Sequence, residues 1–327
     1  MSELASEPLS QGLGLGCAQL GNLYRAMSDE TARAVVDTAW ARGIRYFDTA
    51  PHYGLGLSER RLGAALAGRP RDEYVVSTKV GRLLVDNPGG AGERDTEGFD
   101  VPRTLVRRRD YSRDGVLRSL ESSLTRLGTD RVDIAFVHDP EDYVDEALAG
   151  ALPALIELRD QGVLSGVGLG MNFDAVLAGF VRRADVDVVM IAGRYTLLEQ
   201  PALDELLPLC AERGVRVLAA GVFNSGILAS PTPGGTYDYS TAPAALVERA
   251  RRIAEVCGRH GVELPQAAIA LPAAHPAVAS VVLGASSPAQ VEANADRAAR
   301  PVPPALWAEL IAAGLLRADT PIPQEAS

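Results

Sequence analysis

Four side chains in the first half of the chain could share one acid–base reaction: Asp48, Tyr53, Lys79 and His138. A phenol has a pKa of about 10, so at neutral pH it rarely releases its proton. A nearby ammonium favours the phenolate, which would make the Tyr53 hydroxyl a workable acid–base group beside Lys79. The sequence therefore predicts that Tyr53 exchanges a proton with a substrate oxygen.

Asp48 and His138 take supporting roles in this scheme. A partly buried ammonium tends to lose its proton, and an adjacent carboxylate at Asp48 would hold it charged. A neutral imidazole at His138 can donate a hydrogen bond to a substrate oxygen and fix its position. Taken singly, these residues could also be a helix cap, a surface cation, a packing residue or a loop histidine. Only their placement on the same rim of the fold favours a catalytic role. Such a site would move a proton on or off an oxygen while another group carries a hydride.

Composition adds weight to Lys79, because it is the only lysine among the 32 basic residues. A sequence that otherwise uses arginine would place arginine wherever any surface cation is enough. Lysine differs in being a compact charge whose proton affinity can be tuned. Its position at the end of the apolar run "EYVVSTK" indicates a buried role.

Short β-branched runs alternate with helical patterns along most of the chain. The runs expected as strands are 13–18, 44–48, 73–79, 132–138, 165–170, 186–192, 215–220 and 279–285. The stretches expected as helices are 28–42, 58–68, 113–127, 145–161, 173–183, 201–213, 243–258 and 288–299. Nearly continuous apolar strands that alternate with amphipathic helices favour a parallel sheet covered by helices. With no interdomain linker, this pattern predicts an α/β fold, a closed (β/α)8 TIM barrel.

The predicted barrel places the four candidate residues on one rim. Asp48, Lys79 and His138 end the second, third and fourth strands, and Tyr53 lies in the loop after the second strand. Adjacent strands lie about 4.8 Å apart, so these groups could converge at the C-terminal face, where barrel enzymes build their sites.

A single barrel domain is expected over residues 1–327, with a core at about 12–300 and a C-terminal helix and tail at 301–327. Long loops at 81–112 and 223–243 follow the third and seventh strands. Loops of this length are usually functional lids or disordered segments.

Charge and composition exclude several classes. The formal net charge is −10 and no basic stripe is present, so we expect no nucleic-acid partner. No apolar run approaches the roughly 20 residues of a membrane span, and the polar N-terminus is unlike a secretory signal. Three dispersed cysteines favour reduced thiols and a cytoplasmic location. The pair in "CGRH" (257–260) has no second ligand pair, so we expect no metal site. The glycines of "GLGLG" (12–16) do not match a Rossmann dinucleotide motif.

The segments "FDTAPHYGLGLSE" and "VDIAFVHDP", together with Lys79, resemble the aldo-keto reductase family over about residues 12–300. The resemblance implies a (β/α)8 barrel that uses a nicotinamide cofactor. It makes Tyr53 the acid–base catalyst, tuned by Lys79 and Asp48, and His138 the residue that orients the carbonyl or hydroxyl.

The resemblance also implies a set of cofactor contacts. Asn172 in "GMNF" matches the residue that holds the nicotinamide carboxamide, and "LGASSPAQVEAN" (283–294) matches the adenosine-end segment. The implied cofactor residues are Asn172, Gly221, Phe223, Ser225, Gly226, Gly284, Ser286, Gln290 and Asn294; the implied substrate residues are His52 and Arg194. Two positions depart from the family pattern: Ala220 replaces an aromatic residue, with Phe223 nearby, and Ala192 replaces a glutamine.

The adenosine-end segment bears on the choice between NAD and NADP. A 2′-phosphate brings about two negative charges and needs cations. Residues 283–294 contain no lysine or arginine, with Gly284 and Gln290 where NADPH-using relatives carry cations. NAD is therefore favoured and NADP remains possible, since an arginine from another loop could reverse the preference.

Segments "HDP" (138–140), "RYTLLEQ" (194–200) and "GVFNSGIL" (221–228) are similar to the sugar-dehydrogenase subgroup of this family. That similarity implies oxidation of the anomeric carbon of an aldose, of L-fucose, D-threo-aldose or L-galactose type, to its lactone. The alternatives are oxidation of pyridoxal, reduction of ordinary aldehydes or ketones, and a non-catalytic nucleotide-binding regulatory subunit. We expect a small-molecule sugar or aldehyde substrate and no membrane partner, and the sequence leaves the oligomeric state open.

Overall fold

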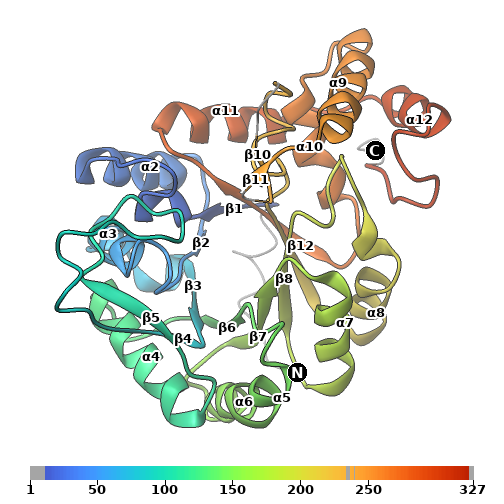
Figure 1. The fold of residues 1–327 in the computed structure, drawn as a ribbon. Helices are drawn as coiled ribbons and strands as arrows, with labels where there is room; N and C mark the ends of the chain where they lie inside the picture. The colour runs from blue at the N-terminus through green and yellow to red at the C-terminus, as the bar shows by residue number, and fades with distance from the viewer. Residues whose placement is uncertain (1–11, 233–235, 239, 324–327) are drawn as a thin grey trace.

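The computed structural model describes residues 12–232, 236–238 and 240–323, and eight of its strands form a closed parallel barrel (Figure 1). The barrel strands are β1 (Gly12–Gly16), β2 (Tyr46–Asp48), β3 (Val75–Val80), β6 (Ile134–His138), β7 (Gly166–Met171), β8 (Val188–Ala192), β9 (Arg216–Ala220) and β12 (Val278–Gly284). Their order around the barrel is β1-β12-β9-β8-β7-β6-β3-β2. The predicted (β/α)8 barrel is thus confirmed. Residues 1–10 and 324–327, which the sequence assigned to a polar start and to the tail, lie outside the described residues.

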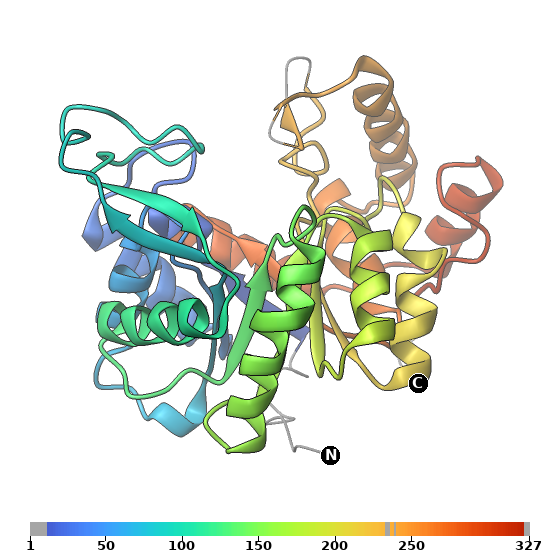
Figure 2. The ribbon, with the colours of Figure 1, turned by 60° about the horizontal axis from the view of Figure 1, so that its bottom comes forward.

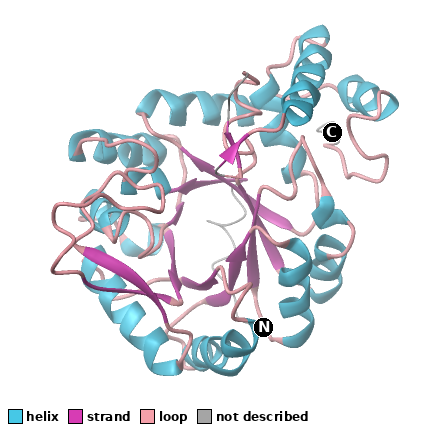
Figure 3. Ribbon diagram, viewed as in Figure 1, coloured by secondary structure: helices cyan, strands magenta, loops and turns pink. Residues whose placement is uncertain are grey.

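Helices surround the strands (Figure 3). They are α2 (Asp29–Ala41), α3 (Leu57–Leu66), α4 (Arg113–Leu127), α5 (Val144–Glu146), α6 (Leu152–Asp160), α7 (Asp174–Arg183), α8 (Leu206–Arg213), α9 (Ala244–Arg259), α10 (Leu264–Ala273), α11 (Pro288–Ala299) and α12 (Pro304–Ala312). A π-helical turn at Ala147–Ala151 joins α5 to α6, and short 3₁₀ turns include Ala18–Gly21 after β1. Side-chain capping fixes where three helices begin: the hydroxyls of Ser28, Ser112 and Ser287 accept hydrogen bonds from backbone amides in the first turns of α2, α4 and α11.

One helix, α10, was not predicted from the sequence. Its residues "LPQAAIALPA" are apolar or uncharged throughout, and most of them are buried. A helix that is buried on nearly all sides shows no amphipathic period, so the pattern that identifies surface helices is absent. This helix is therefore recognised from its packing against the barrel in the structure, and not from the periodicity of its sequence.

The barrel interior is filled by large side chains from several strands. Tyr46, Ile134, Phe136, Val188 and Leu218 are fully buried there and pack against one another. A second apolar layer fills the space between strands and helices. The interior is therefore a packed core, and a site can open only at its ends.

The predicted loop at 81–112 contains an antiparallel hairpin of β4 (Arg82–Asp86) and β5 (Leu105–Arg109). A buried ion pair braces the hairpin segment internally: Arg107 Nη1 and Nη2 lie 2.6 and 3.1 Å from the carboxylate oxygens of Asp95, in the loop between the two strands. Arg107 Nη2 also donates to the carbonyl of His52 at 2.9 Å. The loop at 223–243 carries a shorter hairpin of β10 (Thr236–Tyr237) and β11 (Ser240–Thr241). Figure 2 shows both segments, teal and gold, rising from the same end of the barrel.

Within the described residues, no helix combines the length and apolar character that crossing a membrane requires.

A substitution at Gly168 tests the close approach of the β7 and β8 backbones. A Cβ at Gly168 would lie 1.6 Å from the carbonyl oxygen of Val188, its partner in the ladder. We expect Gly168→Ala to lower the free energy of unfolding by about 3 kcal/mol or more, because backbone must move.

Gly179→Ala in α7 is the matched control, since a Cβ there would meet nothing within 4 Å. It should stabilise the protein by about 0.5–1 kcal/mol, because alanine has the higher helix propensity. Urea unfolding measures both, and equal stabilities of the two variants would contradict the described β7–β8 packing.

Candidate active site

A buried ion pair between Lys79 and Asp48 lies at the C-terminal ends of β3 and β2. Lys79 Nζ donates to the two Asp48 carboxylate oxygens at 2.8 and 2.6 Å and to the carbonyl of Thr49 at 3.0 Å. Ser77 Oγ donates to Asp48 Oδ1 at 2.7 Å. Both charged side chains are about 97% buried or more. The ion pair therefore places a fixed cation and a fixed carboxylate beneath the mouth of the barrel.

Tyr53 lies above this pair, in the turn between β2 and α3. Lys79 Nζ is 4.8 Å from the centroid of the Tyr53 ring. The turn is held by close backbone packing, because Gly54 has a φ of +62° and a Cβ there would lie 2.2 Å from the carbonyl oxygen of Gly21. Few side chains tolerate that conformation and none fits that space, so Gly54 fixes where the phenol points.

The proton affinity of Tyr53 differs from the expectation. Burial raises the pKa of Tyr53 well above its usual range, and the Asp48 and Asp139 carboxylates raise it further. The Lys79 ammonium, which donates its hydrogen bonds to Asp48 and Thr49, does not offset these effects. The phenol is consequently protonated at neutral pH and is ready to act as an acid.

His138 ends β6 and faces Tyr53. The two ring centroids are 5.9 Å apart, and the His138 side chain is 92% buried. Burial, followed by the charge of Arg82, lowers the pKa of His138 well below its usual range. The imidazole is therefore neutral, as the sequence predicted, and one ring nitrogen can donate a hydrogen bond.

His52 stands beside His138 in the same wall, with ring centroids 5.5 Å apart. Arg82 Nη1 lies 3.2 Å from His52 Nδ1. Burial, with Arg82 as the largest charge, lowers the pKa of His52 to about 2. His52 is accordingly a neutral polar group at the cavity, in keeping with the predicted substrate contact.

These residues line a cavity of about 290 Å³, near the lower end of the range for small-ligand sites. The lining residues are Ala18, Leu23, His52, Tyr53, Lys79, Arg82, Glu97, Phe99, His138, Asp139, Gly170, Met171, Asn172, Met190 and Ala192. Sequence reasoning missed Arg82, Glu97 and Asp139. Two of these had a signal, since Asp139 directly follows His138 and Arg82 lies three residues after Lys79.

The predicted cofactor residues follow β7, β9 and β12, which with β8 form one continuous side of the barrel. Asn172 lines the cavity directly after β7, Gly221 to Gly226 follow β9, and Gly284 and Ser286 end and follow β12. Gln19 Oε1 and Asn224 Oδ1 are buried on this side without a hydrogen-bond partner among the described residues. A Cβ at Gly284 would lie 2.5 Å from Gln19 Oε1, so a larger residue there would displace the Gln19 side chain. Vacant acceptors along an extended edge fit an elongated polar ligand such as a dinucleotide.

The adenosine-end residues form a compact turn at the start of α11. Gln290 Oε1 accepts from the Ser286 backbone amide at 2.8 Å, and Asn294 is buried in α11. Arg25, in the segment after β1, donates to Ser286 Oγ at 2.6 Å. This places an arginine from another loop at the segment that itself lacks cations.

Two predicted residues have other partners. Arg194 pairs with Asp238, and its Nη1 lies 3.2 Å from Glu199 Oε1, so it joins the segments after β8 and β9. It is not among the described residues that line the cavity. Phe223 is partly buried and packs against apolar residues of the α9–α10 region.

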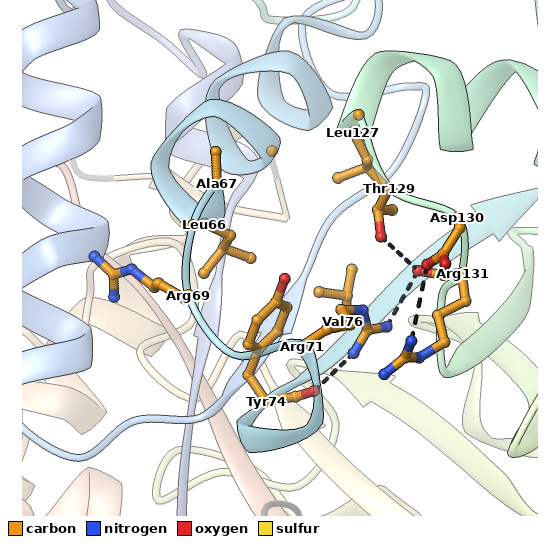
Figure 4. Close-up of a pocket in the computed structure, with 13 residues that line it drawn as sticks. Leu66, Ala67, Arg69, Arg71, Tyr74, Val76, Leu127, Thr129, Asp130 and Arg131 are labelled. Carbon is orange, nitrogen blue, oxygen red and sulfur yellow. Dashed lines mark hydrogen bonds and ion pairs between the residues drawn. The ribbon is translucent and has the colours of Figure 1, made fainter.

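Another cavity, of about 330 Å³, lies at the opposite end of the barrel (Figure 4). It faces the C-terminal ends of α3 and α4, whose partial negative charge arginines can offset. Arg71 donates there to the Tyr74 carbonyl at 2.9 Å and to the Asp133 carboxylate at 2.7 Å. These interactions are structural, so we assign the chemistry to the cavity around Tyr53.

A TIM barrel with a buried Lys–Asp pair, a phenol and a neutral imidazole at its C-terminal face defines an oxidoreductase site of the nicotinamide-dependent type. The family model for the aldo/keto reductase family matches residues 12–313, and the chain belongs to this family. It is an NAD(P)-dependent oxidoreductase.

The relatives agree with this assignment. The chain is 51% identical to D-threo-aldose 1-dehydrogenase from a Pseudomonas species, over 93% of this chain and 94% of the relative. It is 39% identical to pyridoxal 4-dehydrogenase from Microbacterium luteolum, over 93% and 94% of the two chains. Among solved structures, it resembles the holo form of an aldo-keto reductase from Bacillus halodurans, with a TM-score of 0.72, 27% identity, and coverage of 96% and 94%.

The buried ion pair predicts an asymmetric response to substitution. Lys79→Met leaves the Asp48 carboxylate buried without its cation, so the free energy of unfolding should fall by about 3–5 kcal/mol. The double variant Lys79→Met/Asp48→Asn removes both charges and should recover most of that loss. Chemical denaturation of the single and double variants measures the coupling. A double variant as unstable as Lys79→Met would contradict the described pairing.

Proposed function

We propose that this protein oxidises the anomeric carbon of an aldose to the corresponding lactone, with NAD as hydride acceptor. The observation that carries the proposal is the placement of the Tyr53 phenol and the neutral His138 imidazole, their rings 5.9 Å apart, in a cavity that Arg82, Glu97 and Asp139 make strongly polar. A polar wall of this kind suits a substrate with several hydroxyls. The similarity to a D-threo-aldose 1-dehydrogenase, at 51% identity, supports the same substrate class.

In this proposal each residue acts on the substrate oxygen or on its neighbour. His138 donates a hydrogen bond to the anomeric oxygen, and Tyr53, once it has lost its own proton to solvent, accepts as phenolate the proton that this oxygen loses. Lys79, fixed by Asp48, holds an ammonium 4.8 Å from the centroid of the phenol ring. The nicotinamide coenzyme, when bound, accepts the hydride from the anomeric carbon. Asn172 would hold its nicotinamide end, and Gly284, Ser286, Gln290 and Asn294 its adenosine end.

The coenzyme preference is proposed from charge. Residues 283–294 contain no cation that would pair with a 2′-phosphate, which favours NAD. Arg25 is a cation that contacts this segment from another loop, with its Nη2 2.6 Å from Ser286 Oγ. We infer that any use of NADP depends on Arg25.

Pyridoxal oxidation is the second candidate, because the relative from Microbacterium luteolum carries that name and the cavity includes the aromatic ring of Phe99. General aldehyde reduction would use the same four residues. A regulatory, non-catalytic role is disfavoured by the retention of all four.

The three cysteines support the proposed cytoplasmic location. Cys17, Cys210 and Cys257 are buried, free thiols, which is the state that a reducing compartment maintains.

A substrate panel tests the function directly. Formation of NADH or NADPH is followed with L-fucose, D-arabinose, L-galactose, pyridoxal and simple alcohols. We expect the largest kcat/KM with an aldose and NAD, and a lactone as product. Arg25→Ala should lower kcat/KM for NADP and leave that for NAD unchanged. Turnover of pyridoxal alone, or a clear NADP preference that survives Arg25→Ala, would refute the corresponding part of the proposal.

Tyr53→Phe tests the acid–base role, and it should lower kcat by about 10²–10⁴-fold. Because the pKa of Tyr53 is raised and oxidation needs the deprotonated phenol, the wild-type rate of oxidation should increase with pH through the neutral range. The variant should lose this dependence together with its rate.

Tyr195→Phe is the matched control, because it removes a hydroxyl from a fully buried tyrosine that is not among the described residues lining the cavity. Its rate and pH profile should equal those of the wild type. Near-full activity of Tyr53→Phe, or a wild-type oxidation rate that falls as pH rises from 6 to 8, would overturn the assignment.

A further inference from the structure

We infer that Asp139, paired with Arg82, selects substrates that carry a hydroxyl on the carbon next to the reacting carbon. The inference deepens the proposed function, because it takes from it the reaction centre at Tyr53 and His138. It goes beyond that function by naming the residue that distinguishes a sugar from an ordinary aldehyde or alcohol.

The position of Asp139 relative to His138 is the first observation. Asp139 Oδ2 lies 3.6 Å from His138 Nε2, and both residues line the same cavity. If His138 holds the reacting oxygen, a hydroxyl on the adjacent carbon comes within hydrogen-bond reach of the Asp139 carboxylate, since oxygens on neighbouring carbons are themselves about one hydrogen-bond length apart.

The backbone holds Asp139 in place for this contact. Its φ of 42° is left-handed, a conformation that asparagine and aspartate adopt more readily than most residues. Its amide donates to the Gly170 carbonyl at 3.0 Å, and its carbonyl accepts from Arg109 Nη1 at 2.9 Å and Tyr111 Oη at 3.1 Å. The surrounding structure thus maintains an uncommon backbone at the cavity wall, which is typical of functional positions.

Arg82 supplies the complementary group. Its side chain is 91% buried and pairs with the Asp139 carboxylate, and its Nη1 lies 3.5 Å from Glu97 Oε2. The Nε of Arg82 is buried without a partner among the described residues. A carboxylate that accepts beside a guanidinium that donates matches a hydroxyl, which can do both.

The energetic consequence is discrimination between substrates that carry the neighbouring hydroxyl and substrates that lack it. About a quarter of the Asp139 side chain remains exposed at the cavity, and a substrate that fills the cavity removes this part from water. A substrate without the neighbouring hydroxyl leaves the carboxylate desolvated and short of a partner. Sites that hydrogen-bond a substrate hydroxyl reject analogues that lack it far more strongly than apolar pockets reject a missing methylene.

The test compares substrate pairs that differ by this one hydroxyl. In oxidation with NAD, the pair is an accepted aldose and its 2-deoxy analogue; in reduction with NADH, it is 2-hydroxypropanal and propanal. The measured quantity is the ratio of kcat/KM within each pair. We expect a wild-type ratio of about 10- to 100-fold in favour of the hydroxylated substrate, the range of one hydrogen bond to a charged group.

Asp139→Asn keeps the volume and the left-handed backbone but removes the charge, so the ratio should fall about 10-fold, and Asp139→Ala should lower it further. Asp95→Asn is the matched control. Asp95 also pairs with an arginine of the hairpin and is buried, but it is not among the described lining residues. It should leave the ratio unchanged even if it lowers stability, which thermal unfolding of each variant reports.

A ratio near one in the wild type, a ratio unaffected by Asp139→Asn, or an equal fall in Asp95→Asn would overturn the inference and leave aldose oxidation standing. The opposite outcome is distinguishable. No oxidation of any aldose, with an aldehyde ratio that still falls in Asp139→Asn, would refute the proposed function and support the inference. Failure of both pairs to react would refute the two together.

Discussion

The buried pair of Lys79 and Asp48 constrains the whole site. Two charges so far from water are tolerated only when each satisfies the other, and here both oxygens of the carboxylate and three donors of the ammonium are engaged. The pair spans neighbouring strands, so the closure of the barrel fixes its geometry. Tyr53 and His138, at the mouth of the barrel, are therefore positioned relative to an ion pair of fixed geometry.

That constraint also explains the state of Tyr53. The ammonium lies under the ring but gives its hydrogen bonds to Asp48 and Thr49, so burial decides the proton affinity of the phenol. The imidazole of His138 is neutral for the same reason, because burial disfavours its charged form. The site thus presents an acid and a neutral hydrogen-bond donor to one oxygen, a combination that serves reduction directly and oxidation after the phenol has lost its proton.

The sequence predicted the barrel because its strand and helix periods are local properties of the chain. The convergence of Asp48, Tyr53, Lys79 and His138 could also be predicted, since strand ends on a parallel barrel share one face. The sequence did not predict α10, because a helix buried on nearly all sides has no amphipathic period. It also did not predict the roles of Arg82, Glu97 and Asp139. Those residues reach the cavity from a hairpin and a left-handed turn, and such placements depend on tertiary contacts. Similarly, the raised pKa of Tyr53 depends mainly on how deeply the folded protein buries the phenol, which the spacing of residues does not reveal.

The strand order has a consequence for how this protein can change. Strands β2, β3 and β6 carry the proton chemistry, the opposite run from β7 to β12 faces the expected dinucleotide, and the β4–β5 hairpin belongs to neither ladder. Natural variation or engineering can therefore change the hairpin segment, which supplies Arg82, Glu97 and Phe99 to the cavity wall, while leaving the barrel strands intact. Part of the cavity wall can thus change independently of the strands, whereas a change at Asp139 also alters the surroundings of His138.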